Sequence, residues 1–292
     1  MMSSMKIISK KVLVNISDSK ITKIEVYSPL LAKKVLAGQF VLLMVTEKGE
    51  RIPLTVVDRD TEKQTITLIF QEVGYSTKLL GTLNIGDSLY SLVGPLGHAT
   101  PIKKYGKIIA IGGGVGIAEI LPVVKALKGA GNTIISILGA RTKELLILRK
   151  EIKKCSDILH LTTDDGSLGE KGFVSDILER ILKQDSDFSL AYCVGPVPMM
   201  KKVSEVTRPY KIKTTVCLNA IMLDGTGMCG GCRFIEGGKV RFCCVDGPEF
   251  DGHLVDFDEL MQRQKRFVDE EKQALKKLDK HKCRLEYRDE EG

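Results

Sequence analysis

The residues whose types and spacing best suit chemistry lie in one glycine-rich stretch, from Asp224 to Cys244. Asp224 is followed after four residues by Cys229, after two more by Cys232 and after a further eleven by Cys244. Thiolates are the ligands that zinc, copper(I) and iron–sulfur groups prefer, and a carboxylate is a harder ligand. The stretch is therefore a candidate metal centre.

The spacing favours iron–sulfur chemistry. Plant-type [2Fe–2S] sites have the pattern C-x4-C-x2-C…C, and this stretch keeps it with an aspartate at the first position. The glycines allow tight turns and bring backbone N–H groups close to a cluster. Two alternatives remain: a zinc site, which usually needs two close ligand pairs, or unligated thiols. Cys243 and Cys244 are adjacent, so one of them is expected not to bind metal.

Composition bounds the class of protein. The chain has 292 residues, which indicates about two domains. The absence of Trp and an aromatic content of 5% argue against a base-stacking nucleic-acid surface. The net charge of +7 is diffuse, as expected for ordinary solubility. No nucleic-acid partner is therefore expected. No membrane partner is expected either, because the longest apolar run, Ile108 to Val124, is broken by glycines and Glu119.

Cysteine usage predicts the compartment. Besides the four clustered cysteines, the others are scattered, which is not the pattern of a disulfide framework and suits a reducing environment. The first residues, MMSSMKIISKK, hold no apolar segment of signal-peptide length. We therefore expect a cytoplasmic location.

Residues 1–100 read as short strands rich in Val, Ile, Thr and Tyr, separated by turns, as in a small antiparallel barrel. Arg51 to Thr55 begins one strand, and Gly74 to Thr77 opens a short helix. An arginine, a hydroxyl and free N–H groups at a helix start could bind phosphate. A proline-flanked strand and a hydroxyl helix cap are the structural alternatives.

Residues 101–215 alternate strands and helices, which predicts a parallel sheet covered by helices on both faces. Helices are expected over residues 143–154, 174–184 and 197–207, among others. The first strand-to-helix turn is Gly112-Gly113-Gly114-Val115-Gly116, where glycine would let the backbone approach a pyrophosphate. A tight turn without a ligand is the alternative.

Later carboxyl-end turns carry Gly139 and Arg141, Asp164 and Asp165, and Gly195 and Pro196. The two aspartates could bind ribose hydroxyls and would repel a 2′-phosphate, which favours NAD(H) over NADP(H). Arg141, in contrast, favours NADP(H). For the aspartates, a solvated loop without a ligand is the alternative.

Residues 216–250 form the predicted cluster loop and residues 251–292 a helical tail. Asp256 could cap a helix that begins near Phe257. Its apolar stripe would consist of Phe257, Leu260, Met261, Phe267 and Val268. The helix is expected to pack on its own subunit, with docking to a second subunit as the alternative. Beyond Leu278 the chain is highly charged and fraying is expected.

The barrel and the nucleotide domain resemble the ferredoxin–NADP reductase superfamily. There an R-x-[YF]-[ST] strand and a G-x-[ST] helix start bind flavin. Here the position three residues before Thr55 is Ile52, and Arg51 lies one residue earlier. Many members also carry C-G-P at the last strand. Here Val194 separates Cys193 from Gly195, which favours a buried strand position for Cys193.

The whole chain resembles the electron-transfer subunits of two-subunit dihydroorotate dehydrogenases. It is more similar to the small subunits of NADH-dependent reduced ferredoxin:NADP oxidoreductases, also known as sulfide dehydrogenase subunits. The shared segments are Glu50 to Thr55, Thr163 to Ser167, Gly195 to Met200, Asn219 to Cys232 and Cys244 to His253. The resemblance makes Cys244 the ligand rather than Cys243. The dihydroorotate-type subunits have cysteine where Asp224 stands, so the aspartate favours the second family.

The resemblance implies a multidomain β + α/β protein with an antiparallel flavin-binding β-barrel, a doubly wound nucleotide domain, a small [2Fe–2S] loop domain and a helical tail. The implied cofactors are FAD, NAD(H) and a [2Fe–2S] cluster. The implied partner is a large subunit with flavin and [4Fe–4S] groups, and through it ferredoxin. The implied activity is the NAD(H) branch of an electron-bifurcating transhydrogenase. A dihydroorotate-linked subunit and a zinc-stabilised regulatory module are the alternatives.

Four residues are expected to hold the cluster: Asp224, Cys229, Cys232 and Cys244. No acid–base catalytic residue is expected, because the chemistry is mostly placement of cofactors. The residues expected to bind FAD and NAD(H) are Arg51, Pro53, Leu54, Thr55, Phe70, Gln71, Gly74, Ser76, Thr77, Gly112, Gly113, Gly114, Gly116, Gly139, Arg141, Asp164, Asp165, Gly195, Pro196 and Met199.

Overall fold

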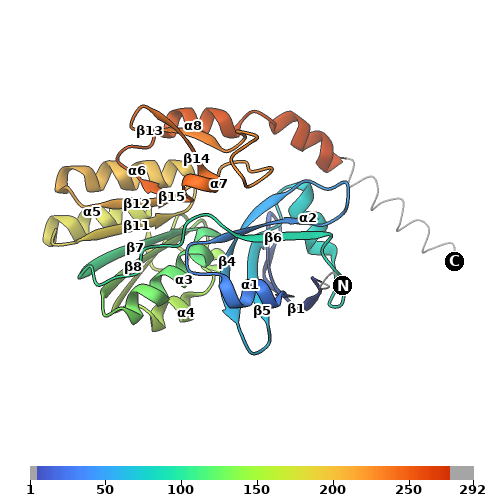
Figure 1. Cartoon of the computed structure of the whole chain (residues 1–292). Helices are drawn as coiled ribbons and strands as arrows, with labels where there is room; N and C mark the ends of the chain where they lie inside the picture. The colour runs from blue at the N-terminus through green and yellow to red at the C-terminus, as the bar shows by residue number, and fades with distance from the viewer. Residues whose placement is uncertain (1–4, 277–292) are drawn as a thin grey trace.

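The structure is a computed structural model that describes residues 5–276. An antiparallel sheet and a mostly parallel sheet lie side by side, and the C-terminal elements cover one end of the parallel sheet (Figure 1). The antiparallel sheet has six strands in the order β1-β2-β5-β4-β3-β6. Their bounds are β1 Ile7–Ile16, β2 Ser19–Tyr27, β3 Phe40–Met44, β4 Ile52–Asp60, β5 Thr65–Gln71 and β6 Ser91–Leu96.

The antiparallel sheet closes on itself. A bridge between Lys6 and Ser88 joins the chain before β1 to the segment before β6. The interior is filled by Ile24, Leu43, Leu68 and other buried side chains. Two short helices, α1 (Pro29–Lys34) and α2 (Tyr75–Thr82), complete this part of the molecule. The predicted antiparallel barrel is confirmed.

The second sheet has seven strands in the order β10-β9-β8-β7-β11-β12-β15. All neighbours run parallel except β12 and β15. The strand bounds are β7 Lys107–Gly113, β8 Thr133–Ala140, β9 Ile158–Thr163, β10 Glu170–Lys171, β11 Leu190–Val194, β12 Thr214–Cys217 and β15 Glu249–Asp251.

Helices cover both faces of this sheet. The bounds are α3 Gly116–Gly129, α4 Arg149–Lys154, α5 Val174–Gln184 and α6 Val197–Thr207, with 3-10 turns η1 at Lys143–Leu145 and η2 at Arg208–Tyr210. Alternate strand residues face the two sides: Ile108 packs with α3 and α4, whereas Ile109 packs with α5 and α6. This two-sided burial makes the sheet doubly wound, as predicted.

The prediction of one helix over residues 143–154 is wrong for the first half of this segment. The chain makes η1, then Leu148 takes a left-handed conformation with φ of 52°, and α4 begins at Arg149. Leu145, Leu146 and Ile147 are consecutive and all buried against the sheet. One helix face cannot bury three consecutive residues, so packing overrides the helical propensity of this segment.

The C-terminal elements are a hairpin of β13 (Arg233–Glu236) and β14 (Lys239–Phe242), then α7 (Cys243–Asp246) and α8 (Phe257–Gln264). Because β15 pairs with β12, the segment after the hairpin belongs to the nucleotide-domain sheet. The predicted domain boundary at residues 215/216 falls within β12.

The predicted cap of α8 is confirmed, since the Asp256 carboxylate accepts a hydrogen bond from the Glu259 N–H at 3.0 Å. Of the predicted stripe, Phe257 and Leu260 are buried, whereas Phe267 is exposed. The fraying expected beyond Leu278 lies outside the described residues. Within the described part of the chain, the helices are too short or too polar to cross a membrane.

Candidate functional site

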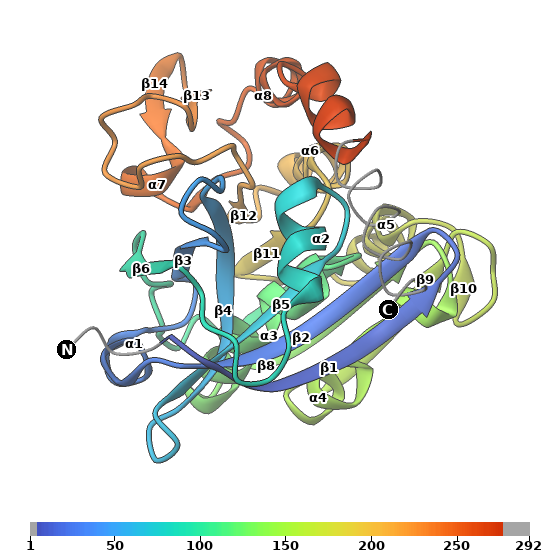
Figure 2. The ribbon, with the colours of Figure 1, turned by 90° about the vertical axis from the view of Figure 1, so that its right-hand side faces the viewer.

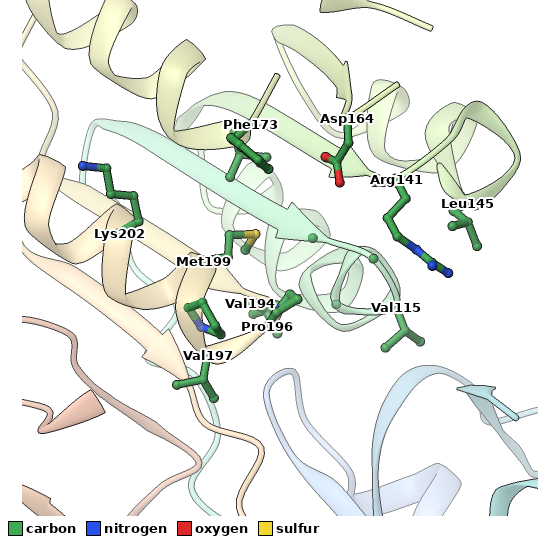
Figure 3. Close-up of a pocket in the computed structure, with 18 of the residues that line it drawn as sticks. Val115, Arg141, Leu145, Asp164, Phe173, Val194, Pro196, Val197, Met199 and Lys202 are labelled. Carbon is green, nitrogen blue, oxygen red and sulfur yellow. The ribbon is translucent and has the colours of Figure 1, made fainter. Parts of the chain in front are cut away.

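A cavity of about 890 Å³ lies between the barrel and the carboxyl ends of the parallel strands. Figure 3 shows side chains from several strand ends around it, with Asp164 and Arg141 on one side and Met199 and Pro196 on another. Ile21 and Gln71 line it from the barrel. Carboxyl ends of strands in such sheets are where ligands bind.

The glycines of the β7–α3 turn are required by close packing. A Cβ on Gly116 would lie 2.6 Å from the Val194 carbonyl oxygen, and one on Gly113 would lie 2.3 Å from the Met199 sulfur. Gly114 has a φ of 57° and donates its N–H to the Gly139 carbonyl oxygen at 2.9 Å. The turn therefore holds its backbone and the start of α3 open to the cavity, as anion binding requires.

The structure brings together most of the residues expected to bind the nicotinamide nucleotide. Nine of these residues line the cavity: Gly113, Gly114, Gly116, Gly139, Arg141, Asp164, Gly195, Pro196 and Met199. Asp165 lines an adjoining cavity. Cys193 is buried in the sheet, where desolvation raises the pKa of its thiol. This burial agrees with the interpretation of Cys193 as a strand residue.

The residues of the barrel that are expected to bind FAD are less closely grouped around the cavity. The Thr55 hydroxyl donates to the Glu119 carboxylate at 3.1 Å, and Ser76 donates to Glu50 at 3.0 Å. The Thr77 hydroxyl accepts the N–H of Gly74, the residue before α2, at 3.1 Å. Ser76 and Thr77 therefore lie in the first turn of α2, whereas Thr55 contacts Glu119, which lines the cavity.

Three further barrel candidates have structural contacts. Arg51 donates to the Leu223 carbonyl oxygen at 3.3 Å, which ties the barrel to the candidate cluster loop. Phe70 is buried in the barrel core, and Leu54 packs against the same core.

Glu119 is one of the cavity residues that the sequence did not indicate. It lies in the first turn of α3 and faces the cavity, where desolvation raises the pKa of its carboxyl group and the Thr55 hydrogen bond partly offsets the rise. Cys217, at the end of β12, lines the same cavity. The sequence signal for Glu119 is an isolated acid in an apolar helix start, which by itself indicates only a break in a hydrophobic run.

The candidate metal ligands are only partly convergent. The sulfur atoms of Cys232 and Cys244 lie 3.3 Å apart, and both side chains are buried. Cys229 is exposed, and its sulfur accepts the Gly231 N–H at 3.4 Å. Among residues 5–276, no set of three or more Cys, His, Asp or Glu side chains stands in metal-binding geometry.

Asp224 organises the loop through its carboxylate. One oxygen accepts the Thr226 N–H at 2.8 Å and the other accepts the Cys229 N–H at 2.7 Å. The backbone hydrogen bonds, that from Thr226 foremost, hold the pKa of Asp224 below its usual range. The donor chemistry of three thiols and one ionised carboxylate fits an iron–sulfur group, and two of the thiols already converge.

The comparisons with known proteins agree with this geometry. Residues 110–205 match the oxidoreductase NAD-binding domain, and residues 219–256 match the iron–sulfur cluster binding domain of dihydroorotate dehydrogenase B. Ferredoxin–NADP+ reductase from Plasmodium falciparum shares the fold, with a TM-score of 0.57 at 17% identity over 70% of this chain and 88% of that one. The two matched domains define an oxidoreductase with an NAD-binding domain and an iron–sulfur cluster binding domain, built on the ferredoxin–NADP reductase fold.

Two full-length relatives define the family more narrowly. The chain is 46% identical over 247 residues to the dihydroorotate dehydrogenase B (NAD(+)) electron transfer subunit homolog of Thermotoga maritima, covering 85% of this chain and 87% of that protein. It is 41% identical to a solved chain of NADH-dependent reduced ferredoxin–NADP oxidoreductase, with a TM-score of 0.88 over 95% of this chain and 99% of that one. The chain belongs to this family of electron-transfer subunits.

The family assignment confirms the expected class of activity and its cofactors. One matched domain binds NAD and the other binds an iron–sulfur cluster. The barrel beside them has the flavoprotein fold of the ferredoxin–NADP reductases. The Thermotoga relative is named as an electron transfer subunit homolog, which agrees with the expectation of a partner subunit.

Proposed function

We propose that this chain is the NAD(H) branch of an electron-bifurcating ferredoxin:NADP transhydrogenase. The observation that carries the proposal is its end-to-end similarity to the solved oxidoreductase chain, at 41% identity and a TM-score of 0.88. The solved structure of that oxidoreductase gives insights into flavin-based electron bifurcation. Asp224 supports the same choice, because the resemblance to the dihydroorotate-type subunits implies a cysteine at that position.

The candidate residues are assigned to FAD or to NAD(H) according to the domain that they come from. Arg51, Pro53, Leu54, Thr55, Phe70, Gln71, Gly74, Ser76 and Thr77 are assigned to the FAD side. The glycine-rich turn and the carboxyl-end residues through Met199 are assigned to NAD(H). With both groups bound, a flavin takes two electrons as hydride and passes them on singly, which a [2Fe–2S] cluster requires. Residues 1–100, 101–215, 216–250 and 251–292 are the proposed functional units.

Asp224, Cys229, Cys232 and Cys244 are the proposed ligands of a [2Fe–2S] cluster, and Cys243 is assigned no metal bond. Cys229 is exposed and Asp224 is only partly buried, so cluster binding would draw them towards the buried pair of thiols. A carboxylate donates less electron density than a thiolate. We therefore expect Asp224→Cys to shift the midpoint potential of the cluster, and an unchanged potential would refute this role.

The proposed partner is a large subunit that carries flavin and [4Fe–4S] groups and exchanges electrons with ferredoxin and NADP(H), in the cytoplasm. The alternative is the electron-transfer subunit of an NAD-linked dihydroorotate dehydrogenase, which the matched iron–sulfur domain and the Thermotoga relative favour.

Purification of the tagged chain with its native partner decides between these functions. The complex should reduce NAD and ferredoxin together at the expense of NADPH, and it should not oxidise dihydroorotate. A complex that couples dihydroorotate oxidation to NAD reduction, with no dependence on ferredoxin, would establish the alternative.

A further inference from the structure

Arg141 has a partner that the sequence does not reveal. It follows β8, beside the predicted ribose-binding aspartates, and a free guanidinium there would favour the 2′-phosphate of NADP(H). In the structure its Nη1 donates to the Asp18 carboxylate at 2.8 Å. Asp18 is 123 residues away in sequence and belongs to the barrel.

The barrel reaches this site through its longest hairpin. β1 ends at Ile16 and β2 begins at Ser19, so Asp18 lies in the two-residue turn at the tip. Figure 2 shows the hairpin running in front of the parallel sheet, with its tip beside β9 and β10. A side chain from one domain is thereby placed against the ligand-binding edge of the other.

Asp18 and Arg141 line a second cavity of about 420 Å³, together with Thr142, Leu145, Asp164 and Asp165. Arg141, Leu145 and Asp164 also line the larger cavity, so the two spaces adjoin. The second cavity is bordered by three carboxyl groups and one guanidinium. Asp165 is fixed by hydrogen bonds from the Ser167 hydroxyl and N–H at 2.6 and 2.9 Å.

We propose that Asp18 makes the nucleotide site selective for NAD(H) over NADP(H), by pairing with Arg141 at the end of the site that receives the adenosine ribose. The inference rests on the proposed function, which places a nicotinamide nucleotide in the larger cavity. A 2′-phosphate carries nearly two negative charges. It would have to displace Asp18 from Arg141 and approach two further carboxylates, whereas ribose hydroxyls can donate to those carboxylates.

The size of the effect follows from exposure. The side chains of Arg141 and Asp18 are 56% and 57% exposed. Ion pairs that are this exposed to solvent contribute little free energy. Asp18 acts through Arg141 and is a positioning residue rather than a catalytic one. Removing its charge should therefore improve NADPH affinity relative to NADH by about two- to fivefold.

The test is to titrate the purified full chain with NADH and with NADPH, following nucleotide fluorescence, for the wild type, Asp18→Asn, Asp58→Asn and Asp18→Asn with Arg141→Gln. Asp58 is a matched control because it also pairs across the two domains, with Lys125 at 3.6 Å, and lies away from both nucleotide cavities. The ratio of the two dissociation constants is the readout, since general loosening of the fold would move both constants together.

The ratio should shift towards NADPH in Asp18→Asn at low ionic strength, stay at the wild-type value in Asp58→Asn and return to it in the double variant. An unchanged ratio in Asp18→Asn, or a gain that survives the Arg141→Gln change, would overturn the inference. A wild-type chain that binds neither nucleotide would refute the proposed site itself. Wild-type binding of NADH with an unresponsive ratio would refute this inference alone.

Discussion

Replacement of Phe234 by alanine should loosen the junction between the β13–β14 hairpin, which lies between the proposed ligands Cys232 and Cys244, and the parallel sheet. Phe234 lies in β13 and is 1% exposed. Its ring meets that of Phe250, in β15, edge to face, with centroids 4.5 Å apart and an interplanar angle of 68°. Because β15 pairs with β12, this contact links the hairpin to the strand that ends at the cavity.

The expected cost is about 3–5 kcal/mol, which is typical of truncating a buried phenylalanine. About 0.5–1.5 kcal/mol of that reflects the aromatic pair beyond simple burial. A loss of this size is a large share of the about 5–15 kcal/mol that stabilises a domain. The damage should be concentrated in the C-terminal segment, so iron retention should fall before the barrel unfolds.

Denaturant unfolding and iron content of the purified chain provide the assay. Phe267→Ala is the control, because Phe267 is 50% exposed and its truncation should change stability by less than about 0.5 kcal/mol. A Phe234→Ala protein that loses less than about 1 kcal/mol and keeps its full iron content would show that this aromatic pair does not anchor the hairpin.

Three further changes test separate parts of the structure. Gly116→Ala should weaken NADH binding and cost about 1–3 kcal/mol, because its Cβ would meet the Val194 carbonyl oxygen at 2.6 Å. Gly129→Ala, later in α3 and with open space for a Cβ, should be tolerated, and equal effects would contradict the packing argument. Glu119→Gln should gain stability relative to the wild type as pH rises, measured by unfolding at about pH 4, 6 and 8. Burial raises the folded-state pKa of Glu119 above its unfolded value, so its ionisation destabilises the wild type through that window, whereas glutamine does not titrate; a constant difference would refute this. Cys243→Ser should keep its iron and Cys244→Ser should lose it, and the reverse result would exchange their roles.

Local patterns in the sequence predict much of the fold. The predicted helices over residues 174–184 and 197–207 have the same bounds as α5 and α6, because strong amphipathic periodicity and flanking turns both act locally. The glycine-rich turn is predictable for the same reason. The segment around Leu145 to Ile147 is not, because burial against the sheet decides its conformation.

Contacts between distant residues could not be predicted from the sequence. The pairing of β15 with β12 joins two segments that lie on opposite sides of the cysteine loop. The Thr55–Glu119 hydrogen bond and the Asp18–Arg141 ion pair each cross between the two large domains. None of these contacts has a periodicity or spacing that a single sequence displays, although together they determine what the cavity presents to a nucleotide.

The most direct test of the proposed electron path from NADH through FAD to the [2Fe–2S] cluster is an anaerobic titration of the purified, reconstituted chain with NADH, followed by visible and electron paramagnetic resonance spectroscopy and by metal analysis. A flavin- and [2Fe–2S]-binding subunit that oxidises NADH should show flavin absorbance that NADH bleaches, about two iron atoms per chain and a one-electron signal of a reduced [2Fe–2S] cluster. Zinc in place of iron, with no flavin absorbance and no response to NADH, would contradict this path.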